Sequence, residues 1–228
     1  MVEWISDGSI VNGDFAYLCG ALVSGLWVGD VKRKYEIKDG IRYHAQHRVS
    51  LTTSDYSYAS YLGDVLRRLT SLHPIVREYT YKTKVKGIEY NNPSTRLKVS
   101  FPMREIELFN HLTRFKGDYQ RLDQLLLRSD RNILRRFLQA VFDAKLTIAS
   151  KGNDLYMSMT VTEKTFPIIS SILGKYGIHH TFSPEKNPAT IRITTQKEVD
   201  RIIAEIDFAS ERVNSNIRDF TEDLCQVL

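Results

Sequence analysis

The chain has 228 residues, of which 42% are hydrophobic and 26% are charged. These proportions are ordinary for a folded globular protein and exclude a largely disordered chain. Lysine and arginine total 32 against 27 aspartate and glutamate residues, and the net charge of +5 permits a polyanionic partner without requiring one. Two cysteines, Cys19 and Cys225, are too few for a disulfide framework or a metal quartet, so we expect a reducing, cytoplasmic setting.

The longest uncharged run covers residues 15–29. It is shorter than the roughly 20 residues that a membrane-spanning helix needs, so we predict a core helix there and no membrane partner. The charges at Glu3 and Asp7 also argue against a secretory signal.

A helix followed by a strand occurs twice in the chain. The segment "DFAYLCGALVSGLWVGDVKRKYEI" (14–37) is matched 120 residues later, with Leu18 over Leu138 and Gly20 over Ala140. An internal repeat of this kind determines the whole fold, so the same order of elements is expected after each copy.

The elements that follow the first copy alternate strands and helices. Asp39 and Gly40 form a strong hairpin signal between two alternating segments. The predicted elements are strands at 31–38 and 41–52, a helix at 54–71, strands at 75–87 and 95–101 joined by the turn-rich "YNNPS", and a helix near 103–114.

The elements that follow the second copy come in the same order. They are strands at 146–151 and 155–162, a helix at 163–177, short strands at 178–182 and 190–194, a helix at 196–208 and a tail helix within 210–228. We therefore predict an α+β protein with two αββαββα repeats at 1–115 and 116–228, linked by about 115–130.

The element order, its doubling and the two helix ends "YLCGALVSGLW" and "FLQAVFDAKLT" resemble the LAGLIDADG homing endonucleases in their single-chain, two-repeat form. The stretches "SDRNILRRFLQAVFDA" (129–144) and "RVSLTTSDYSYASYLGDVL" (48–66) are also similar to that family. The resemblance covers nearly the whole chain. It implies two pseudo-twofold-related repeats with saddle-shaped antiparallel sheets, and fused repeats that make a monomer sufficient.

Two helices that cross closely need small residues on the contact face, one turn apart. Gly20 and Ser24 meet this need in the first copy, and Ala140 and Ala144 meet it in the second. We expect these four residues to pack the two repeats together.

In this family, the acidic residue that closes each motif binds divalent metal. Aligning the letters L-A-G-L-I-D-A-D-G with each helix end places Gly25 at that position in the first copy and Lys145 in the second. Neither can ligate Mg²⁺, which requires oxygen ligands, so we predict no catalytic residue, no metal site and no cofactor. Asp30 and Asp143 are the nearest acids that a displaced active site would use.

The strands of the first half alternate apolar and basic residues. We predict that the apolar rows Ile41–Leu51, Leu97–Phe101 and Val31–Ile37 face the helices and that the basic rows face DNA. The second half has a polar face with little charge. The predicted DNA-binding residues are Lys32, Lys34, Arg42, His44, Gln46, Arg48, Lys82, Lys84, Arg96, Lys98, Lys151 and Arg192.

Residues 1–115 have a net charge of +4 and residues 116–228 a net charge of +1, so the first repeat should dominate binding. The resulting expectation is a double-stranded DNA-binding protein, derived from a LAGLIDADG endonuclease, that does not cleave and acts as a regulator or architectural factor. Three alternatives stay open: an endonuclease with displaced ligands that uses Mg²⁺, an RNA-binding splicing factor of the maturase kind, and a protein-binding scaffold.

Overall fold

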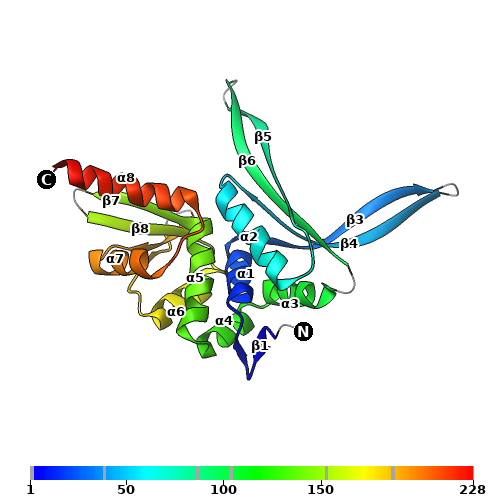
Figure 1. Ribbon diagram of the computed structural model, residues 1–228, viewed down its shortest axis with the longest axis horizontal. Coiled ribbons are helices and arrows are strands. Elements are labelled where there is room, and N and C mark those ends of the chain that lie inside the picture. Colours follow the sequence, from blue (N-terminus) through cyan, green and yellow to red (C-terminus); the bar gives the residue numbers. More distant parts are fainter. Residues whose placement is uncertain are drawn as a thin grey trace.

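The computed structural model describes residues 3–37, 40–85, 88–102, 105–151, 154–185 and 188–227. Side chains are described over the same ranges except at 33, 35–37, 40–44, 81, 83–85, 88–91, 151, 154 and 220–227. After a short N-terminal hairpin, the order helix, two strands, helix, two strands, helix occurs twice (Figure 1).

Most elements lie where they were predicted, but β3 and β6 begin earlier, β9 lies later, and β1, β2 and α4 were not predicted. The first part comprises β1 (Ile5–Ser6), β2 (Ser9–Ile10), α1 (Gly13–Ser24), β3 (Trp27–Ile37), β4 (Gly40–Thr53), α2 (Tyr56–Leu69), β5 (Ile75–Val85), β6 (Ile88–Phe101) and α3 (Ile106–Gly117). The second part comprises α4 (Tyr119–Arg128), α5 (Arg131–Lys145), β7 (Leu146–Lys151), β8 (Asp154–Val161), α6 (Phe166–Tyr176), β9 (Thr181–Ser183), β10 (Ala189–Ile193), α7 (Gln196–Glu205) and α8 (Glu211–Val227).

The two larger sheets have the same topology. Their strand orders are β3-β4-β6-β5 and β7-β8-β10-β9, and all neighbouring strands are antiparallel. The predicted doubling of an αββαββα unit is therefore confirmed. The strands of the first sheet have 11 or 14 residues, whereas those of the second have 3 to 8. The hairpins of the first sheet consequently extend from the body as two arms (Figure 1).

The expected turn at "YNNPS" is wrong, because β6 already begins at Ile88. Pro93 lies inside this strand, opposite Thr80 of β5. In the described residues, β4 pairs with β6 only over Thr95–Phe101, so Pro93 lies where β6 has one open edge. A strand tolerates proline at an open edge because the missing N–H breaks no ladder bond there.

The connection expected at 115–130 is mostly helical and belongs to the core. α3 continues to Gly117, so the expected boundary between residues 115 and 116 falls inside a helix. Asp118 caps α4 by accepting a hydrogen bond from the Arg121 N–H at 3.0 Å. Leu122 and Leu126 of α4 are fully buried, and a single apolar core joins the two repeats.

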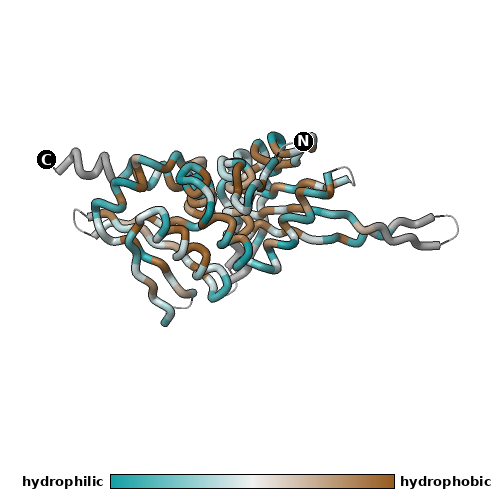
Figure 2. Tube along the Cα trace, turned by 90° about the horizontal axis from the view of Figure 1, so that it is seen from below, coloured by the Kyte–Doolittle hydropathy of each residue, from teal (hydrophilic) through white to brown (hydrophobic). Residues whose placement is uncertain are grey.

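The central helices α1 and α5 run side by side (Figure 1). Residues 15–23 of α1 are all buried, which is expected of a helix surrounded by other elements. Apolar stretches gather around these helices in Figure 2. No helix in the described part of the chain is both long and apolar enough to cross a membrane, and the uncharged run at 15–29 is α1 with the start of β3.

Candidate nucleic-acid interface

α1 and α5 approach closely at Gly20. A Cβ atom added there would overlap the carbonyl oxygen of Phe137 and lie 2.9 Å from the Cβ of Ala140, so only glycine permits this approach. Gly20 and Ala140 are equivalent positions of the two repeats, which places the pseudo-twofold axis between them. Ala144 is half-buried against the core, and the hydroxyl of Ser24 is buried without a hydrogen-bond partner among the described residues.

Gly25 ends α1 in a conformation that other residues rarely adopt, with φ 123° and ψ 8°. The next N–H, that of Leu26, donates to the carbonyl of Ala21 at 2.9 Å and closes the helix end. Nothing lies within 4 Å of the position that a Cβ of Gly25 would occupy. An acidic side chain would therefore have space at this site, but its backbone would be strained.

Lys145 ends α5 differently, because the chain passes directly into β7 at Leu146 without a glycine. Its half-buried ammonium donates to the carbonyl oxygen of Thr160 in β8 at 3.3 Å. Burial lowers the pKa of Lys145, since a charged group is disfavoured away from water. We call Gly25 and Lys145 the helix feet: one presents open space and the other a cation.

The two nearby acids have structural partners. Asp143 is 1% exposed, and its carboxylate accepts hydrogen bonds from the N–H groups of Ala209 and Ser210, at 2.9 and 3.0 Å, and from the Tyr17 hydroxyl at 2.8 Å. Burial raises the pKa of Asp143 to about 7, against the opposing effect of these hydrogen bonds. Asp30 instead pairs with Nδ1 of the neighbouring-strand His47 at 2.7 Å.

A divalent metal does not fit the helix feet. Mg²⁺ and Ca²⁺ are held by carboxylate, carbonyl and water oxygens, whereas Gly25 has no side chain and Lys145 contributes a positive charge. In the part of the chain that the structure describes, no group of three His, Cys, Asp or Glu side chains is arranged to hold a metal.

The register of the first sheet sorts its residues into two faces. Val49 of β4 pairs with Val28 of β3 and with Val99 of β6, and all three are buried against the helices. Residues adjacent to them in sequence point to the opposite side, which we call the open face. The cationic and amide side chains described on it are Gln46, Arg48, Arg77, Arg96 and Lys98.

Arg77 was not predicted from the sequence. The basic residues predicted in β5 were Lys82 and Lys84, which lie in the other row of that strand. It pairs directly with Arg96 of β6. Two cations opposite each other on one face repel, which favours an anionic partner between them. Arg48 in turn donates to the side-chain oxygen of Gln46 at 2.8 Å, so these two side chains are oriented together.

The expectation that Lys32 and Lys34 share the open face is corrected by the register. Lys32 pairs with Ala45 and lies in the same row as the buried Val28, and Lys34 lies in that row as well. The apolar row starting at Val31 suggested the reverse. Its residues extend along the arm away from the buried end of β3, so the alternation there says nothing about which row faces the core.

Lys82 also lies on the side opposite to the open face. It shares its row in β5 with Val76, which packs against the core, whereas Arg77 and Tyr79 occupy the other row. Four further predicted residues have side chains outside the described part of the structure: Arg42, His44, Lys84 and Lys151.

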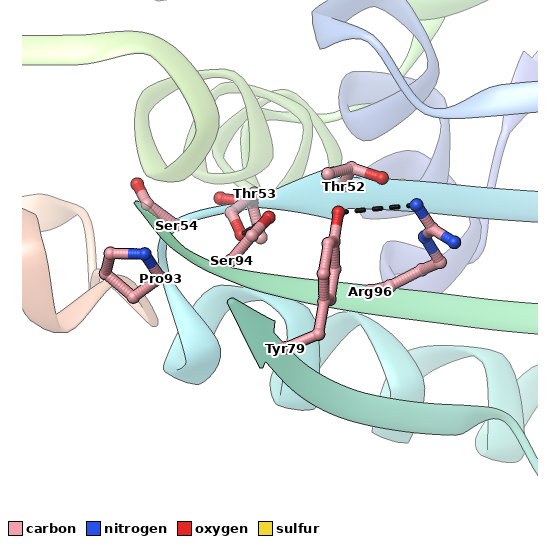
Figure 3. Close-up of a pocket in the computed structure, with 7 residues that line it drawn as sticks. All are labelled: Thr52, Thr53, Ser54, Tyr79, Pro93, Ser94 and Arg96. Atoms are coloured by element: carbon pink, nitrogen blue, oxygen red, sulfur yellow. Dashed lines mark hydrogen bonds between the residues drawn. The ribbon is translucent and has the colours of Figure 1, made fainter. Parts of the chain in front are cut away.

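The open face contains a polar hollow of about 480 Å³ where β4 ends, beside the middle of β5 and β6 (Figure 3). Arg96 lies over the ring of Tyr79, with its guanidinium carbon 4.8 Å from the ring centroid, and donates to the Tyr79 hydroxyl at 3.4 Å. Hydrogen bonds from Ser94 and then Arg96 lower the pKa of Tyr79. The lining residues are Thr52, Thr53, Ser54, Tyr79, Pro93, Ser94 and Arg96. A guanidinium that is oriented by a tyrosine and surrounded by hydroxyl groups can donate hydrogen bonds to a phosphate or to a base edge.

The open face of the second sheet carries mostly hydroxyl groups. Ser158 of β8 pairs with Thr147 of β7 and with Arg192 of β10, and Thr160 pairs with Thr190. Arg192 is the one cation on these strands among the side chains that the structure describes. The charge difference between the two repeats therefore appears on their open faces.

Solved structures share this arrangement over most of the chain. I-SmaMI bound to uncleaved DNA target in the presence of calcium ions has a TM-score of 0.56 at 8% identity, over 93% of this chain and 90% of its own. I-LtrWI, a LAGLIDADG homing endonuclease bound to target DNA, has a TM-score of 0.54 at 14% identity, over 94% and 91%. The chain has the LAGLIDADG homing endonuclease fold.

The homing endonuclease I-WcaI bound to its DNA recognition sequence also has this fold, with a TM-score of 0.55 at 11% identity, over 87% of this chain and 82% of its own. No family model matches the sequence, and no curated protein matches it either. The LAGLIDADG fold is thus visible here in the order and packing of elements, at sequence identities that carry little information about individual residues.

Proposed function

We propose that this LAGLIDADG-fold protein binds double-stranded DNA without cleaving it, as a regulator or architectural factor. One observation carries the proposal: the helix feet are Gly25 and Lys145, while the open face of the first sheet keeps Arg48, Arg96 and Lys98. The protein has the surface for a polyanion but lacks the acidic pair that the resemblance assigns to metal binding.

DNA binding is supported by the chemistry of the open face. Arginine and lysine contact phosphates, and arginine and glutamine also read base edges in the major groove. The three structures compared above were each determined with DNA. Gln46 and Arg48 are already oriented together, as are Tyr79 and Arg96, so less conformational entropy is lost when DNA binds.

The metal requirement of phosphodiester hydrolysis supports the proposed absence of cleavage. Metal-assisted hydrolysis of a phosphodiester needs an ion that activates water and stabilises the leaving oxygen. The buried Asp143 carboxyl group already accepts three hydrogen bonds, and Asp30 is paired with His47 of the neighbouring strand β4. We further propose a cytoplasmic monomer, since the two fused repeats supply internally the symmetry that a one-repeat protein gains by dimerisation.

The test is a comparison of ligands and of metal conditions with the purified full chain. A mixed-sequence duplex should bind more tightly than single-stranded DNA or folded RNA, and its affinity should fall steeply with salt. Supercoiled plasmid should stay intact in Mg²⁺ and in Mn²⁺. Nicking would favour an endonuclease with displaced ligands, preference for folded intron RNA would favour a splicing factor, and absence of all nucleic-acid binding would favour a scaffold.

A further inference from the structure

The C-terminal ends of α1 and α5 come together at the helix feet. The helices touch at Gly20 and Ala140. α1 ends four residues after Gly20, at Ser24, and α5 ends five residues after Ala140, at Lys145. The end of a helix carries a partial negative charge of about half an elementary charge, from carbonyl groups without helical partners. Two such ends side by side repel a DNA backbone unless cations cover them.

A cation does cover the end of α5, and it comes from another element. Arg212 at the start of α8 donates to the carbonyls of Leu146 and Asp143, at 2.6 and 3.2 Å, and so offsets the partial negative charge at the end of α5. On the other repeat, Lys116 of α3 donates to the carbonyl of Val28 in β3 at 2.7 Å, beyond the end of α1.

Lys145 differs from these two cations because its charge is poorly compensated. Its ammonium has one long hydrogen bond, to Thr160, and no carboxylate pairs with it among the described residues. The side chain is half-buried, and Lys145 stands directly before Leu146, whose partner Met159 is adjacent to Thr160, so it continues the row of Thr147 and Thr160. A half-buried ammonium with unused donors is suited to receive an anion.

We propose that Lys145, with Arg212 beside it at the end of α5, is a phosphate-binding centre that holds the duplex backbone near the pseudo-twofold axis in place of divalent metal. The ligand is a backbone phosphate of double-stranded DNA, and binding needs no divalent cation. The inference rests on the proposed duplex binding, because it names the central contact of that same surface.

The first test is the salt dependence of binding to a mixed-sequence duplex long enough to span both sheets. The logarithm of affinity falls linearly with the logarithm of salt concentration, and loss of one phosphate contact makes this fall less steep by about 0.9. Lys145→Ala should show this decrease, and Lys145→Arg should keep the wild-type slope. Lys175→Ala is the matched control, because Lys175 is exposed on α6, away from the strands.

The second test locates the contact by lysine acetylation and mass spectrometry. Duplex should protect Lys145 and leave Lys175 equally reactive with and without DNA. Addition of a chelator should leave wild-type affinity unchanged, whereas Lys145→Glu should weaken binding more than Lys145→Ala does.

The inference is overturned if wild-type protein binds duplex with a steep salt slope while Lys145→Ala keeps that slope and Lys145 stays unprotected. It is also overturned if a chelator abolishes wild-type binding. Either result leaves the proposed DNA binding intact, whereas failure of the wild-type protein to bind duplex removes both.

Discussion

At the foot of α1 the chain turns through a glycine, whereas at the foot of α5 it continues through Lys145 into β7. Two residues earlier in each helix the repeats differ again, because Val23 is a buried apolar residue and Asp143 is a buried carboxyl group. The sheets differ in the same sense, with long basic strands in the first repeat and short, hydroxyl-rich strands in the second. The repeats share a common architecture but differ at the helix feet and on the open faces of their sheets.

The difference at Asp143 ties the second repeat to the tail helix. Asp143 accepts two N–H groups from the α7–α8 connection, and Ser210 at the start of α8 donates its hydroxyl to Asp55 at 2.5 Å. Asp55 is the N-cap of α2 in the first repeat. The start of α8 therefore connects the two repeats near the helix feet.

The packing that the repeats have in common gives the largest expected effect. Gly20→Ala should lower the free energy of unfolding by about 3 kcal/mol, because its Cβ would collide with backbone of α5. Chemical denaturation measures this. Gly174→Ala is the matched control, since nothing lies within 4 Å of its Cβ position in α6, and it should be neutral or slightly stabilising. Equal effects of the two variants would contradict a close approach at the axis.

The charge difference between the sheets predicts the next effect. Arg96→Ala combined with Lys98→Ala should weaken duplex binding about 30-fold, taking roughly 1 kcal/mol for each contact. Arg192→Ala should weaken duplex binding a few-fold at most. Lys32→Ala should weaken it little, because Lys32 lies on the opposite side of the first sheet. Titration by fluorescence anisotropy measures all three. A larger loss from Lys32→Ala than from the double variant would reverse our assignment of the open face.

The buried carboxyl group of the second repeat predicts a pH dependence. Burial raises the pKa of Asp143 to about 7, from an ordinary value of 3.8. Between pH 3.8 and about 7 the folded protein therefore keeps a proton on Asp143 that the unfolded chain has already released. Stability should therefore fall as pH rises between about 4 and 7, by up to roughly 1.4 kcal/mol per unit from this group, and then level off. Asp143→Asn should flatten that slope, and Asp200→Asn on the surface should not.

The oriented arginine of the first sheet predicts the smallest effect. Tyr79→Phe keeps the ring under Arg96 and removes the hydroxyl that Arg96 contacts, so duplex affinity should fall only about 2- to 3-fold. Tyr79→Leu removes the ring as well and should cost more. Tyr156→Phe on the second sheet is the control with the same chemical change. A change at Tyr156 as large as that at Tyr79 would show that the two open faces contribute alike.

Local patterns predicted most of the fold, because each depends on residues close in sequence. Asp39 and Gly40 marked the first hairpin, and Asp55 marked the start of α2, whose cap it forms by accepting from the Tyr58 N–H at 2.9 Å. The helix of the inter-repeat connection was missed, although Asp118 before a leucine-rich segment is the signal that would have found it.

The candidate site was only partly predictable. The alignment of the repeats identified Gly25 and Lys145 as the helix feet. The residues that contact the helix feet are known only from the structure. Arg212 comes from α8, far away in sequence, so nothing near the motif indicates that it covers the end of α5. The carbonyl that Lys145 contacts belongs to β8, and this contact depends on how β7 and β8 pair.

By itself, the sequence determined the doubling, the order of elements and the residue types at the two helix feet, since capping, turn and helix periodicity act over a few residues. Only the tertiary structure decided which row of each first-repeat strand faces outward. Alternation defines two rows but does not say which row meets the core, and pairing with Val28 and Val49 settles that question. Lys32, Lys34 and Lys82 thereby leave the open face, and Arg77 joins it.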